Sequence, residues 1–521
     1  MRTPRKLWFA AVFAIAFLGS AAAQKPRESL TQLKLDKTTI TAATLIPAGW
    51  FKFPQPTTIA TPSVDLGAHC RVEAVVRLTS DSEISLKSGC LPARGHATAA
   101  TDDGHTGPDR PDASWARGHP EKIIDFGYRA VHQTAVQSKA ILNAFYGKNP
   151  TRGYFDGCSD GGREALMEAQ RFPKDFDGII VGAPANYWIH LFAGFIWNEK
   201  ALMHDPASWI APNKLPAIQR AALAACDSLD GVKDGLVEDP RRCHFDPPTI
   251  QCQGSDAHDC LTAAQVDALK KIYSGPKNPR TGEMIFPGYV PGDEVALWNW
   301  PFWIAGLTSP KEAAQAQFGN ALFGDMVFEN PKWDFRTLDF DKDVALADQK
   351  IGPLLNSNDP NVKPFKANGG KLLQYHGWSD GAIAPLNSIN YYEQVVAELS
   401  GSGTQKDSLS VLGDFYRLFM APGVGHCGGG SGPDSFGDLA LSSRSQLHDP
   451  DHDVLNALEQ WVENGKAPEK IIATKYVGGD PKKGIAMTWP LCPYPQMAQY
   501  KGSGDSNDAA NFTCVVSKEN N

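Results

Sequence analysis

Alternating apolar and polar positions predict strands and helices in succession near the start of the chain. Residues 71–78 and 96–101 alternate as strands do, and residues 126–147 place apolar side chains at the spacing of a helix of roughly six turns. A short apolar run then leads through Gly157-Cys158-Ser159-Asp160-Gly161 into a second helical pattern, and residues 177–184 are typical of a buried strand. This part of the chain therefore predicts strands that alternate with helices.

The same succession returns late in the chain. Residues 371–375 and 416–420 are predicted strands, and residues 453–463 have the apolar spacing of an amphipathic helix. Strands that alternate with helices favour a mainly parallel sheet with helices on both faces, which is an α/β fold.

Between these two parts the succession stops. Residues 186–350 are rich in Trp, Pro and Asp and give no clear alternation of strand and helix. A chain of 521 residues also exceeds the size at which single cores stop growing. We therefore predict an inserted domain over residues 186–350, within an α/β unit made of residues 24–185 and 351–521.

The first residues have the pattern of a secretory leader. Three basic residues among the first six are followed by an apolar run at residues 7–18 and by Ala21-Ala22-Ala23. This pattern predicts a signal peptide over residues 1–23, and a membrane anchor is the alternative, which needs about 20 apolar residues. We expect a secreted or periplasmic protein without further membrane contact.

Charge and cysteines narrow the classes of function. Removing the leader takes away three basic residues and no acidic ones, so the formal charge moves from −8 to −11, which argues against nucleic acid as a partner. Ten cysteines in an exported chain favour disulfides. Sequence proximity pairs Cys70 with Cys90, Cys226 with Cys243, Cys252 with Cys260, and Cys492 with Cys514. Cys158 and Cys427 are left over.

Ser159 is the candidate nucleophile. Gly-x-Ser-x-Gly between a strand and a helix is the nucleophile elbow of α/β hydrolases, in which Gly157 and Gly161 would let the backbones pack closely. A serine needs a base that a carboxylate orients, and in this fold the partners follow in the order Ser, Asp, His, each after a core strand. Asp380 and His426 occupy those places, and the backbone N–H of Asp160 would be one oxyanion donor.

Each of these residues also has a simpler interpretation. Asp380 precedes Gly381 as a turn-forming Asp would, and His426 would serve as a zinc ligand or a packed loop histidine. Chain order and strand context together favour the triad. If Cys158 and Cys427 pair, they tie the nucleophile to the base, because each cysteine is the chain neighbour of one of them.

These residues carry a resemblance to a known family. Cys158-Ser159, Asp380 and His426-Cys427 resemble the signature of the tannase and feruloyl esterase family, and the likeness extends over most of residues 70–514. The resemblance implies a lid domain that prefers aromatic acids. We therefore expect a secreted serine esterase that acts on small aromatic esters, feruloyl esterase first, with tannase or a terephthalate-monoester hydrolase as alternatives.

An acidic loop in the inserted domain suits calcium. Residues 226–236 crowd three carboxylates into eight residues, with glycines to turn the chain. Hard oxygen ligands in a tight loop favour Ca²⁺, although a solvated acidic turn has the same pattern. Resemblance to the family's lid implies a structural Ca²⁺. Its ligands would be the side chains of Asp227, Asp230 and Asp234 and the backbone carbonyls of Val232 and Leu236.

The inserted domain also contains a group of aromatic residues. They either form its core or contact an aromatic substrate, and the sequence does not say which of them face the site. The residues are Trp298, Trp300, Phe302, Trp303, Trp333 and Phe335.

One segment of the family pattern is missing. Relatives carry a Trp-Asn-Gly and Gly-Gly segment after an early strand, whereas this chain runs from residues 78–86 directly to Lys87-Ser88-Gly89-Cys90. We predict that a core strand and the second oxyanion donor are absent, unless Ser88, Gly89 or another group substitutes. One lost donor costs on the order of 100–1000-fold in rate. A faulty gene sequence would give the same gap, and an aromatic-ligand-binding protein without catalysis or a calcium-dependent structural protein are the competing functions.

Overall fold

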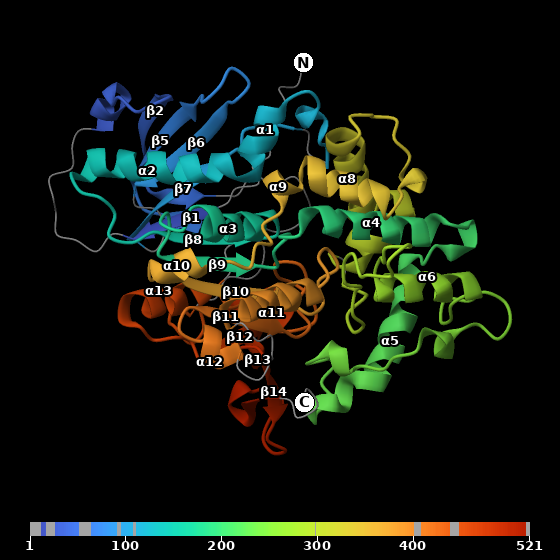
Figure 1. Ribbon diagram of the computed structural model, residues 1–521. Helices are drawn as coiled ribbons and strands as arrows, with labels where there is room; N and C mark the ends of the chain where they lie inside the picture. Colours follow the sequence, from blue (N-terminus) through green and yellow to red (C-terminus); the bar gives the residue numbers. More distant parts are fainter. Residues whose placement is uncertain are drawn as a thin grey trace.

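A large mixed sheet organises the protein and brings distant parts of the chain together (Figure 1). The computed structural model describes residues 12–16, 27–51, 64–90, 95–107, 111–296, 298–400, 408–437 and 447–516. The strands are β1 (Val12–Ala16), β2 (Thr38–Ile46), β3 (Gly49–Phe51), β4 (Val64–Leu66), β5 (His69–Val76), β6 (Ile84–Cys90), β7 (His96–Thr101), β8 (Tyr154–Cys158), β9 (Gly178–Gly182), β10 (Lys371–Gly377), β11 (Tyr416–Ala421), β12 (Ile471–Tyr476), β13 (Ile485–Leu491), β14 (Gln496–Tyr500) and β15 (Phe512–Val516). Nine of them form one sheet in the order β11-β10-β9-β8-β1-β7-β6-β5-β2.

Helices cover both faces of this sheet. They are α1 (Pro120–Ile124), α2 (Ala130–Tyr146), α3 (Asp160–Arg171), α4 (Trp188–Met203), α5 (Leu215–Cys226), α6 (Ala263–Ser274), α7 (Ala314–Ala321), α8 (Lys342–Lys350), α9 (Gly352–Leu355), α10 (Lys363–Ala367), α11 (Leu386–Ser400), α12 (Ser408–Leu412) and α13 (Val454–Asn464). Helices α2 and α3 pack on one face, and α13 packs on the other. The strands and the final helix predicted late in the chain correspond to β10, β11 and α13.

The half of the sheet that carries the candidate site is parallel. Strands β8, β9, β10 and β11 run in the same direction, so their carboxyl ends meet at one edge. Side chains alternate between two buried faces, because Ile179 packs with Leu166 of α3 whereas Ile180 packs with Leu458 of α13. Burial on both faces explains the continuous apolar runs of these strands.

The other half of the sheet is antiparallel, which the prediction of a mainly parallel sheet missed. Strands β2, β5, β6 and β7 pair antiparallel with one another. Their connections are short: β5 ends at Val76 and β6 begins at Ile84, and β6 ends at Cys90 and β7 begins at His96. A parallel pair needs a crossover of a dozen or more residues, so connections of this length dictate hairpins.

A segment of the predicted leader lies in the middle of the sheet. Val12–Ala16 forms β1, which pairs antiparallel with β7 on one side and β8 on the other. The rest of residues 1–23 lies outside the described part of the chain. Strand β1 therefore holds the place beside the elbow strand where the sequence predicted that a core strand was absent.

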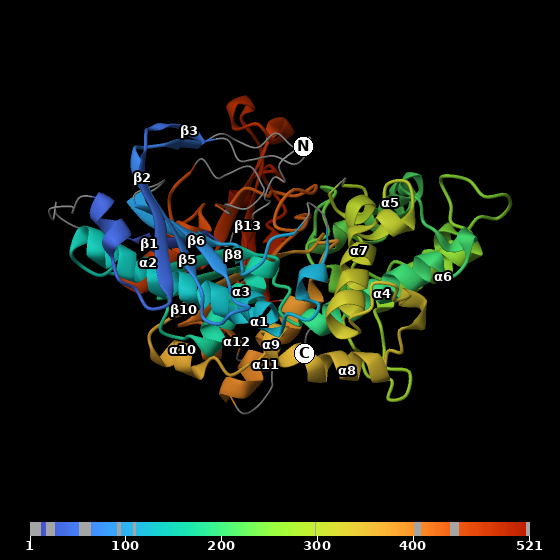
Figure 2. The ribbon, with the colours of Figure 1, turned by 90° about the horizontal axis from the view of Figure 1, so that it is seen from above.

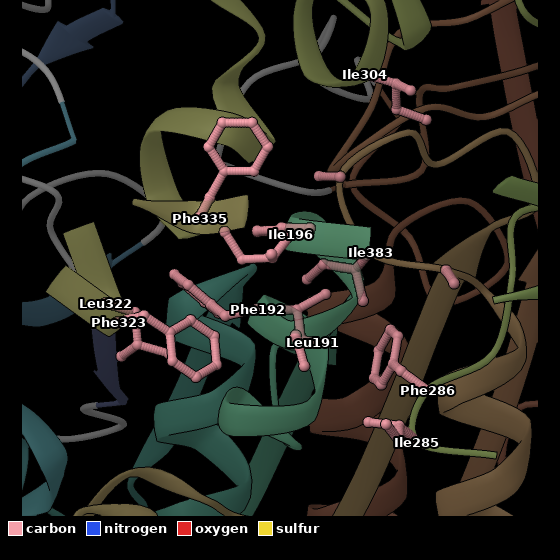
Figure 3. Packing of buried hydrophobic residues seen from close by; sticks show 14 of the residues in the cluster. Leu191, Phe192, Ile196, Ile285, Phe286, Ile304, Leu322, Phe323, Phe335 and Ile383 are labelled. Carbon is pink, nitrogen blue, oxygen red and sulfur yellow. The ribbon is translucent and has the colours of Figure 1, made fainter. Parts of the chain in front are cut away.

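Between β9 and β10 the chain is helical and forms its own core. Helices α4 to α8 lie beside the sheet, on the right of Figure 2. Their buried side chains, such as Phe192, Ile196 and Phe323, form one cluster with Ile383 from the loop after β10 (Figure 3). The core of this segment therefore reaches the loop that follows Asp380. Within the described residues, none of the helices is both long and apolar enough to cross a bilayer.

Candidate active site

Ser159 lies on a tight turn between β8 and α3. Its backbone has φ 69° and ψ −119°, a strained conformation for a residue with a side chain. A Cβ atom at Gly157 would lie 2.4 Å from the carbonyl oxygen of Gly161, and one at Gly162 would lie 2.4 Å from that of Gly182. These two positions therefore require glycine. A side chain at Gly161 would meet open space, so the prediction that this position requires glycine is wrong. The second glycine that the turn requires is Gly162.

The structure brings the three predicted triad residues into one hydrogen-bonded chain. The Nε2 atom of His426 lies 2.8 Å from the Oγ of Ser159, and its Nδ1 lies 2.8 Å from Oδ2 of Asp380. Asp380 follows β10 and His426 follows β11, so both come from loops at the same edge of the parallel strands. In this arrangement Nδ1–H donates to the carboxylate, and Nε2 accepts the proton of the serine.

Asp380 is fully buried and held by four donors. Its Oδ1 accepts from the backbone N–H groups of Ala382 at 2.7 Å and Ile383 at 2.9 Å, and its Oδ2 accepts from His426 and from His376 at 3.1 Å. Burial alone would raise the pKa of Asp380, but the neighbouring His426 and the hydrogen bonds from both histidines hold it below its ordinary value. The carboxylate is therefore ionised at neutral pH.

His376 belongs to the site, and the sequence interpretation gave it no role. It is buried, and its Nε2 shares Oδ2 of Asp380 with His426, while its Nδ1 lies 2.7 Å from the Oγ of Ser388. The His376 ring thereby helps to fix the carboxylate that orients His426. Its position four residues before Asp380 at the end of a predicted strand was the available signal.

A disulfide connects the chain neighbours of the nucleophile and the base. Cys158 and Cys427 are bonded, with their Cα atoms 5.9 Å apart and a sequence separation of 269. The predicted pairs Cys226–Cys243, Cys252–Cys260 and Cys492–Cys514 are also formed. Cys70 lies directly opposite Cys90 in the β5–β6 pair, and the side chain of Cys90 lies outside the described part of the structure.

Removing the central disulfide should cost both stability and activity. For Cys158→Ala/Cys427→Ala we expect the free energy of unfolding to fall by about 5 kcal/mol, because the unfolded chain gains the freedom of a very long loop. The rate should fall as well, since the loops of Ser159 and His426 lose their connection. Urea unfolding and nitrophenyl acetate hydrolysis measure the two effects.

A matched control removes a disulfide away from the triad. Cys252→Ala/Cys260→Ala opens a loop with a sequence separation of only 8 residues, so its loss of stability should be smaller, about 2.5 kcal/mol in the same loop-entropy treatment. Its hydrolysis rate should stay near that of the wild type. Equal losses of activity in the two variants would contradict a special role for the Cys158–Cys427 link.

The structure offers one oxyanion donor at the elbow. Asp160 is the first residue of α3, so its backbone N–H has no acceptor within the helix. It lies at the N-terminus of the helix, which is the positive end of the helix dipole. The suggestion that Ser88 or Gly89 supplies the second donor is wrong. Both lie on β6, and strands β7 and β1 separate β6 from the elbow strand β8.

The loop that follows strand β1 cannot supply the missing oxyanion donor. It runs antiparallel to β8, so the chain leaves β1 at the sheet edge opposite the loops of Ser159, Asp380 and His426. In the family arrangement, the second donor comes from the loop that follows a strand beside the elbow strand. The loop that follows β1 therefore supplies no oxyanion donor.

A buried arginine stabilises the turn that carries Ser159. Arg163 donates from Nε to the Asp160 carboxylate at 2.5 Å and from its two terminal nitrogens to the carbonyls of Gly127 and Phe126 at 2.7 and 3.0 Å. It fixes the first turn of α3 to the preceding helical segment. The sequence interpretation missed Arg163, because a charged residue on a helix is usually solvated.

Two buried acids lie beside this arginine. Burial, and then the charge of Asp160, raises the pKa of Asp103 well above its ordinary value. Burial, and then the charge of Asp103, raises the pKa of Glu164 in the same way. The turn after β7 therefore places a buried acid, Asp103, next to the Asp160 and Arg163 pair at the start of α3.

Of the aromatic residues named from the sequence in the segment 186–350, Trp303 contacts the triad. Its ring meets the His426 ring edge to face at 5.1 Å, and it lies parallel to Phe318 at 6.0 Å. Trp300 is buried in the core of the helical segment, as is Phe335, and Trp333 packs against Phe323. The core interpretation therefore holds for these three, whereas Trp303 lies against the histidine of the triad.

The acidic loop has the donors that a hard cation needs. Oδ1 of Asp227 accepts from the backbone N–H groups of Asp234 and Gly235, and Oδ1 of Asp230 and of Asp234 accept from those of Val232 and Leu236. These bonds curl the loop on itself. The Oδ2 atoms of Asp230 and Asp234 are buried without a partner, which fits an ion between them.

Burial shifts the titration of these two acids. It raises the pKa of Asp230 to about 6 and that of Asp234 to about 7. The loop also touches the catalytic half, because a side chain at Gly423, three residues before His426, would meet Leu236 at 2.6 Å. An ordered acidic loop therefore supports the loop that carries His426.

Comparison with known proteins agrees with this geometry. The sequence model of the family described as tannase and feruloyl esterase matches residues 37–515. An uncharacterized esterase of Xanthomonas campestris pv. campestris is 41% identical over 542 aligned residues, covering 96% of this chain and 93% of the relative. Because this alignment is longer than the 521 residues of the chain, the relative has residues that this chain lacks.

Two further relatives cover much of the chain. Mono(2-hydroxyethyl) terephthalate hydrolase of Piscinibacter sakaiensis is 34% identical over 81% of this chain and 74% of its own length. The crystal structure of feruloyl esterase B from Aspergillus oryzae has a TM-score of 0.80 at 27% identity, covering 93% of this chain and 98% of that one. The chain belongs to the tannase and feruloyl esterase family and is a carboxylic ester hydrolase of that type.

Proposed function

We propose that this protein is a secreted serine esterase that hydrolyses esters of aromatic acids. The observation that carries the proposal is the hydrogen-bonded chain Ser159–His426–Asp380, with Trp303 against the His426 ring. A feruloyl ester is the first candidate substrate. Gallate esters and terephthalate monoesters follow, since one relative is named for the latter.

The proposed reaction proceeds through an acyl-enzyme. The Oγ of Ser159 attacks the ester carbonyl while Nε2 of His426 takes its proton, and Asp380 stabilises the imidazolium that forms. The N–H of Asp160 stabilises the oxyanion. His426 returns the proton to the leaving alkoxide, then activates water, which attacks the acyl-enzyme and releases the acid and free Ser159.

A substrate panel tests the proposal. The purified protein is assayed with methyl ferulate, methyl gallate, a terephthalate monoester and methyl butyrate, and we expect an aromatic ester to have the highest kcat/KM. Preference for the butyrate ester would contradict the aromatic assignment. Equal absence of turnover on all four would contradict the esterase assignment for this chain.

The role of Trp303 has its own prediction. For Trp303→Ala we expect kcat/KM on the preferred aromatic ester to fall by roughly 10–100-fold, because an aromatic contact of about 1–3 kcal/mol is lost, while nitrophenyl acetate is affected less. Trp298→Ala is the matched control, since Trp298 is 44% exposed and contacts Phe302 rather than the triad. Equal effects of the two substitutions would remove Trp303 from the proposed acyl site.

A binding protein without turnover is the second candidate. The observation in its favour is β1, which runs antiparallel beside the elbow strand where the donor loop of an active relative would begin. Release of nitrophenol from nitrophenyl acetate distinguishes the two. An esterase gives a burst or steady turnover, and a binding protein gives neither.

We propose that the helical segment over residues 186–350 is the lid and that its acidic loop holds a structural Ca²⁺. Side chains of Asp227, Asp230 and Asp234 would hold the ion, helped by the carbonyls of Val232 and Leu236. When bound, Ca²⁺ would supply the positive charge that offsets the three carboxylates. The partnerless oxygens of Asp230 and Asp234 support this assignment.

Chelation tests the calcium proposal. With EGTA we expect the Tm to fall by several degrees and the hydrolysis rate to fall with it, because a bound ligand stabilises the folded state and this loop supports that of His426. Added Ca²⁺ should restore both. Asp230→Asn should abolish the response and Asp267→Asn, an exposed acid elsewhere in this segment, should keep it. A Tm unchanged by EGTA would overturn the assignment.

We propose from the leader pattern that the protein is exported and that its leader is cleaved, which would change the sheet. Cleavage after residue 23 would remove β1 from between β7 and β8. The mature protein and the full chain therefore differ at the strand beside Ser159. N-terminal sequencing of protein collected from the medium or the periplasm decides between them.

A further inference from the structure

We propose a second metal site, for a transition-metal ion such as Zn²⁺, formed by His132, Glu168 and Asp175. One potential ligand atom from each residue lies within 4.8 Å of the other two. His132 is on α2, Glu168 is on α3, and Asp175 is in the loop between α3 and β9. The site is separate from the acidic loop of the lid, and the inference does not depend on the proposed function.

Glu168 is the observation that points to a ligand. Its side chain is 1% exposed and lies against the other two residues. Within the described residues, no N–H or hydroxyl group donates to its carboxylate oxygens, and its polar neighbour is the Asp175 carboxyl group. Buried carboxylates of native proteins are nearly always hydrogen-bonded, paired or bound to an ion. Two acids in contact at this depth need a cation or a shared proton.

The other two residues are arranged as ligands. The Nδ1 of His132 lies 2.6 Å from Oδ2 of Asp175, and the His132 ring is stacked on Phe172 at 3.9 Å, which fixes its orientation. The nearby Lys139 ammonium donates to the backbone carbonyl of Asp175, and within the described residues it makes no hydrogen bond to the Glu168 carboxylate. Side chains of His132 and Asp175 are 26% and 15% exposed, which leaves an open side for a water ligand.

The ligand set selects the class of ion. One imidazole and two carboxylates suit Zn²⁺, Co²⁺ or Mn²⁺, whereas Ca²⁺ and Mg²⁺ prefer oxygen ligands alone. Two ligands of a tetrahedral Zn²⁺ at about 2 Å lie roughly 3.3 Å apart. Nδ1 of His132 and Oδ2 of Asp175, now 2.6 Å apart, would therefore separate slightly, and the Glu168 oxygen would come within that distance of both. Glu168 is nine residues after Ser159, which directly precedes α3, and this corresponds to about 13 Å along the helix axis. The ion would therefore cross-link α2, α3 and the loop before β9 without touching the reacting atoms.

Cobalt titration tests the site. The full-length protein is stripped with EDTA, given excess Ca²⁺ to fill the lid loop, and titrated with Co²⁺ and separately with Zn²⁺. We expect a visible absorption band of four-coordinate Co²⁺ that saturates at one equivalent, and a rise in Tm of roughly 2–4 °C with Zn²⁺. Nitrophenyl acetate hydrolysis should change little.

Three variants make the outcome decisive. Glu168→Gln keeps the side-chain volume. His132→Gln changes a more exposed position and serves if Glu168→Gln does not fold. Each variant should lose the Co²⁺ absorption band and the rise in Tm with Zn²⁺. The control His119→Gln breaks a similar histidine–carboxylate pair, with Asp81 at 2.7 Å, and should keep both. Wild-type protein that binds no more Co²⁺ than His132→Gln would overturn the site and leave a proton shared by Glu168 and Asp175.

Discussion

Replacing Ser159 with alanine should abolish hydrolysis. For Ser159→Ala we expect kcat on nitrophenyl acetate to fall by at least about 10⁴-fold, because no other group can form the acyl-enzyme once Oγ is gone. The fold should persist, since the Cys158–Cys427 disulfide, Gly157 and Gly162 all remain. The measurement is initial rate at saturating substrate, with circular dichroism as the check on folding.

A second serine gives the matched control. Ser88 is buried on β6, its hydroxyl has no hydrogen-bond partner, and strands β7 and β1 separate it from the elbow strand. Ser88→Ala should therefore leave kcat within about twofold, because it removes no bond from the site. If Ser159→Ala kept more than a thousandth of the activity, the nucleophile would have to be another residue. A large loss in Ser88→Ala would restore Ser88 as an oxyanion donor.

Local patterns in the sequence were sufficient to predict the parts of the fold that surround the triad. Strands β10 and β11 are apolar runs with turn residues directly after them, and α13 has a clear amphipathic spacing. In the other half of the sheet, the short connections between strands dictate that neighbouring strands are antiparallel. The spacing of the strands in the sequence would have predicted this. The place of β1 was not predictable, because Val12–Ala16 has the composition of a leader.

The site was predictable to the extent that its residues lie in local motifs. Ser159, Asp380 and His426 each follow a strand, and cysteines beside two of them indicated a pair across 269 residues. His376 and Trp303 were not assigned roles, because these depend on which side chains meet across the fold. The calcium loop stays a prediction, supported by partnerless oxygens that only coordinates reveal.

Replacing Asp380 with asparagine should be nearly as damaging as losing the nucleophile. The two backbone N–H groups of Ala382 and Ile383 donate to Oδ1, so the amide oxygen of the asparagine must occupy that position. Its NH₂ group then takes the place of Oδ2, where it faces N–H groups of both His426 and His376. Donor would oppose donor at two histidines.

His426 can relieve this conflict only by moving its proton to Nε2. That tautomer cannot accept the proton of Ser159, so we expect Asp380→Asn to lower kcat by about 10⁴-fold at neutral pH with KM little changed. Removing a buried acceptor shared by two rings should also lower the Tm. Steady-state kinetics and thermal unfolding measure the two effects.

The matched control changes a residue that contacts His376 rather than the Asp380 carboxylate. Ser388→Ala removes the hydroxyl that lies 2.7 Å from Nδ1 of His376 but leaves the carboxylate and both of its histidines in place. One net hydrogen bond is worth about 0.5–1.5 kcal/mol, so the rate should fall by no more than about tenfold. If Asp380→Asn lost no more activity than Ser388→Ala, Asp380 would be a structural turn residue, and the carboxylate that orients His426 would have to be sought elsewhere.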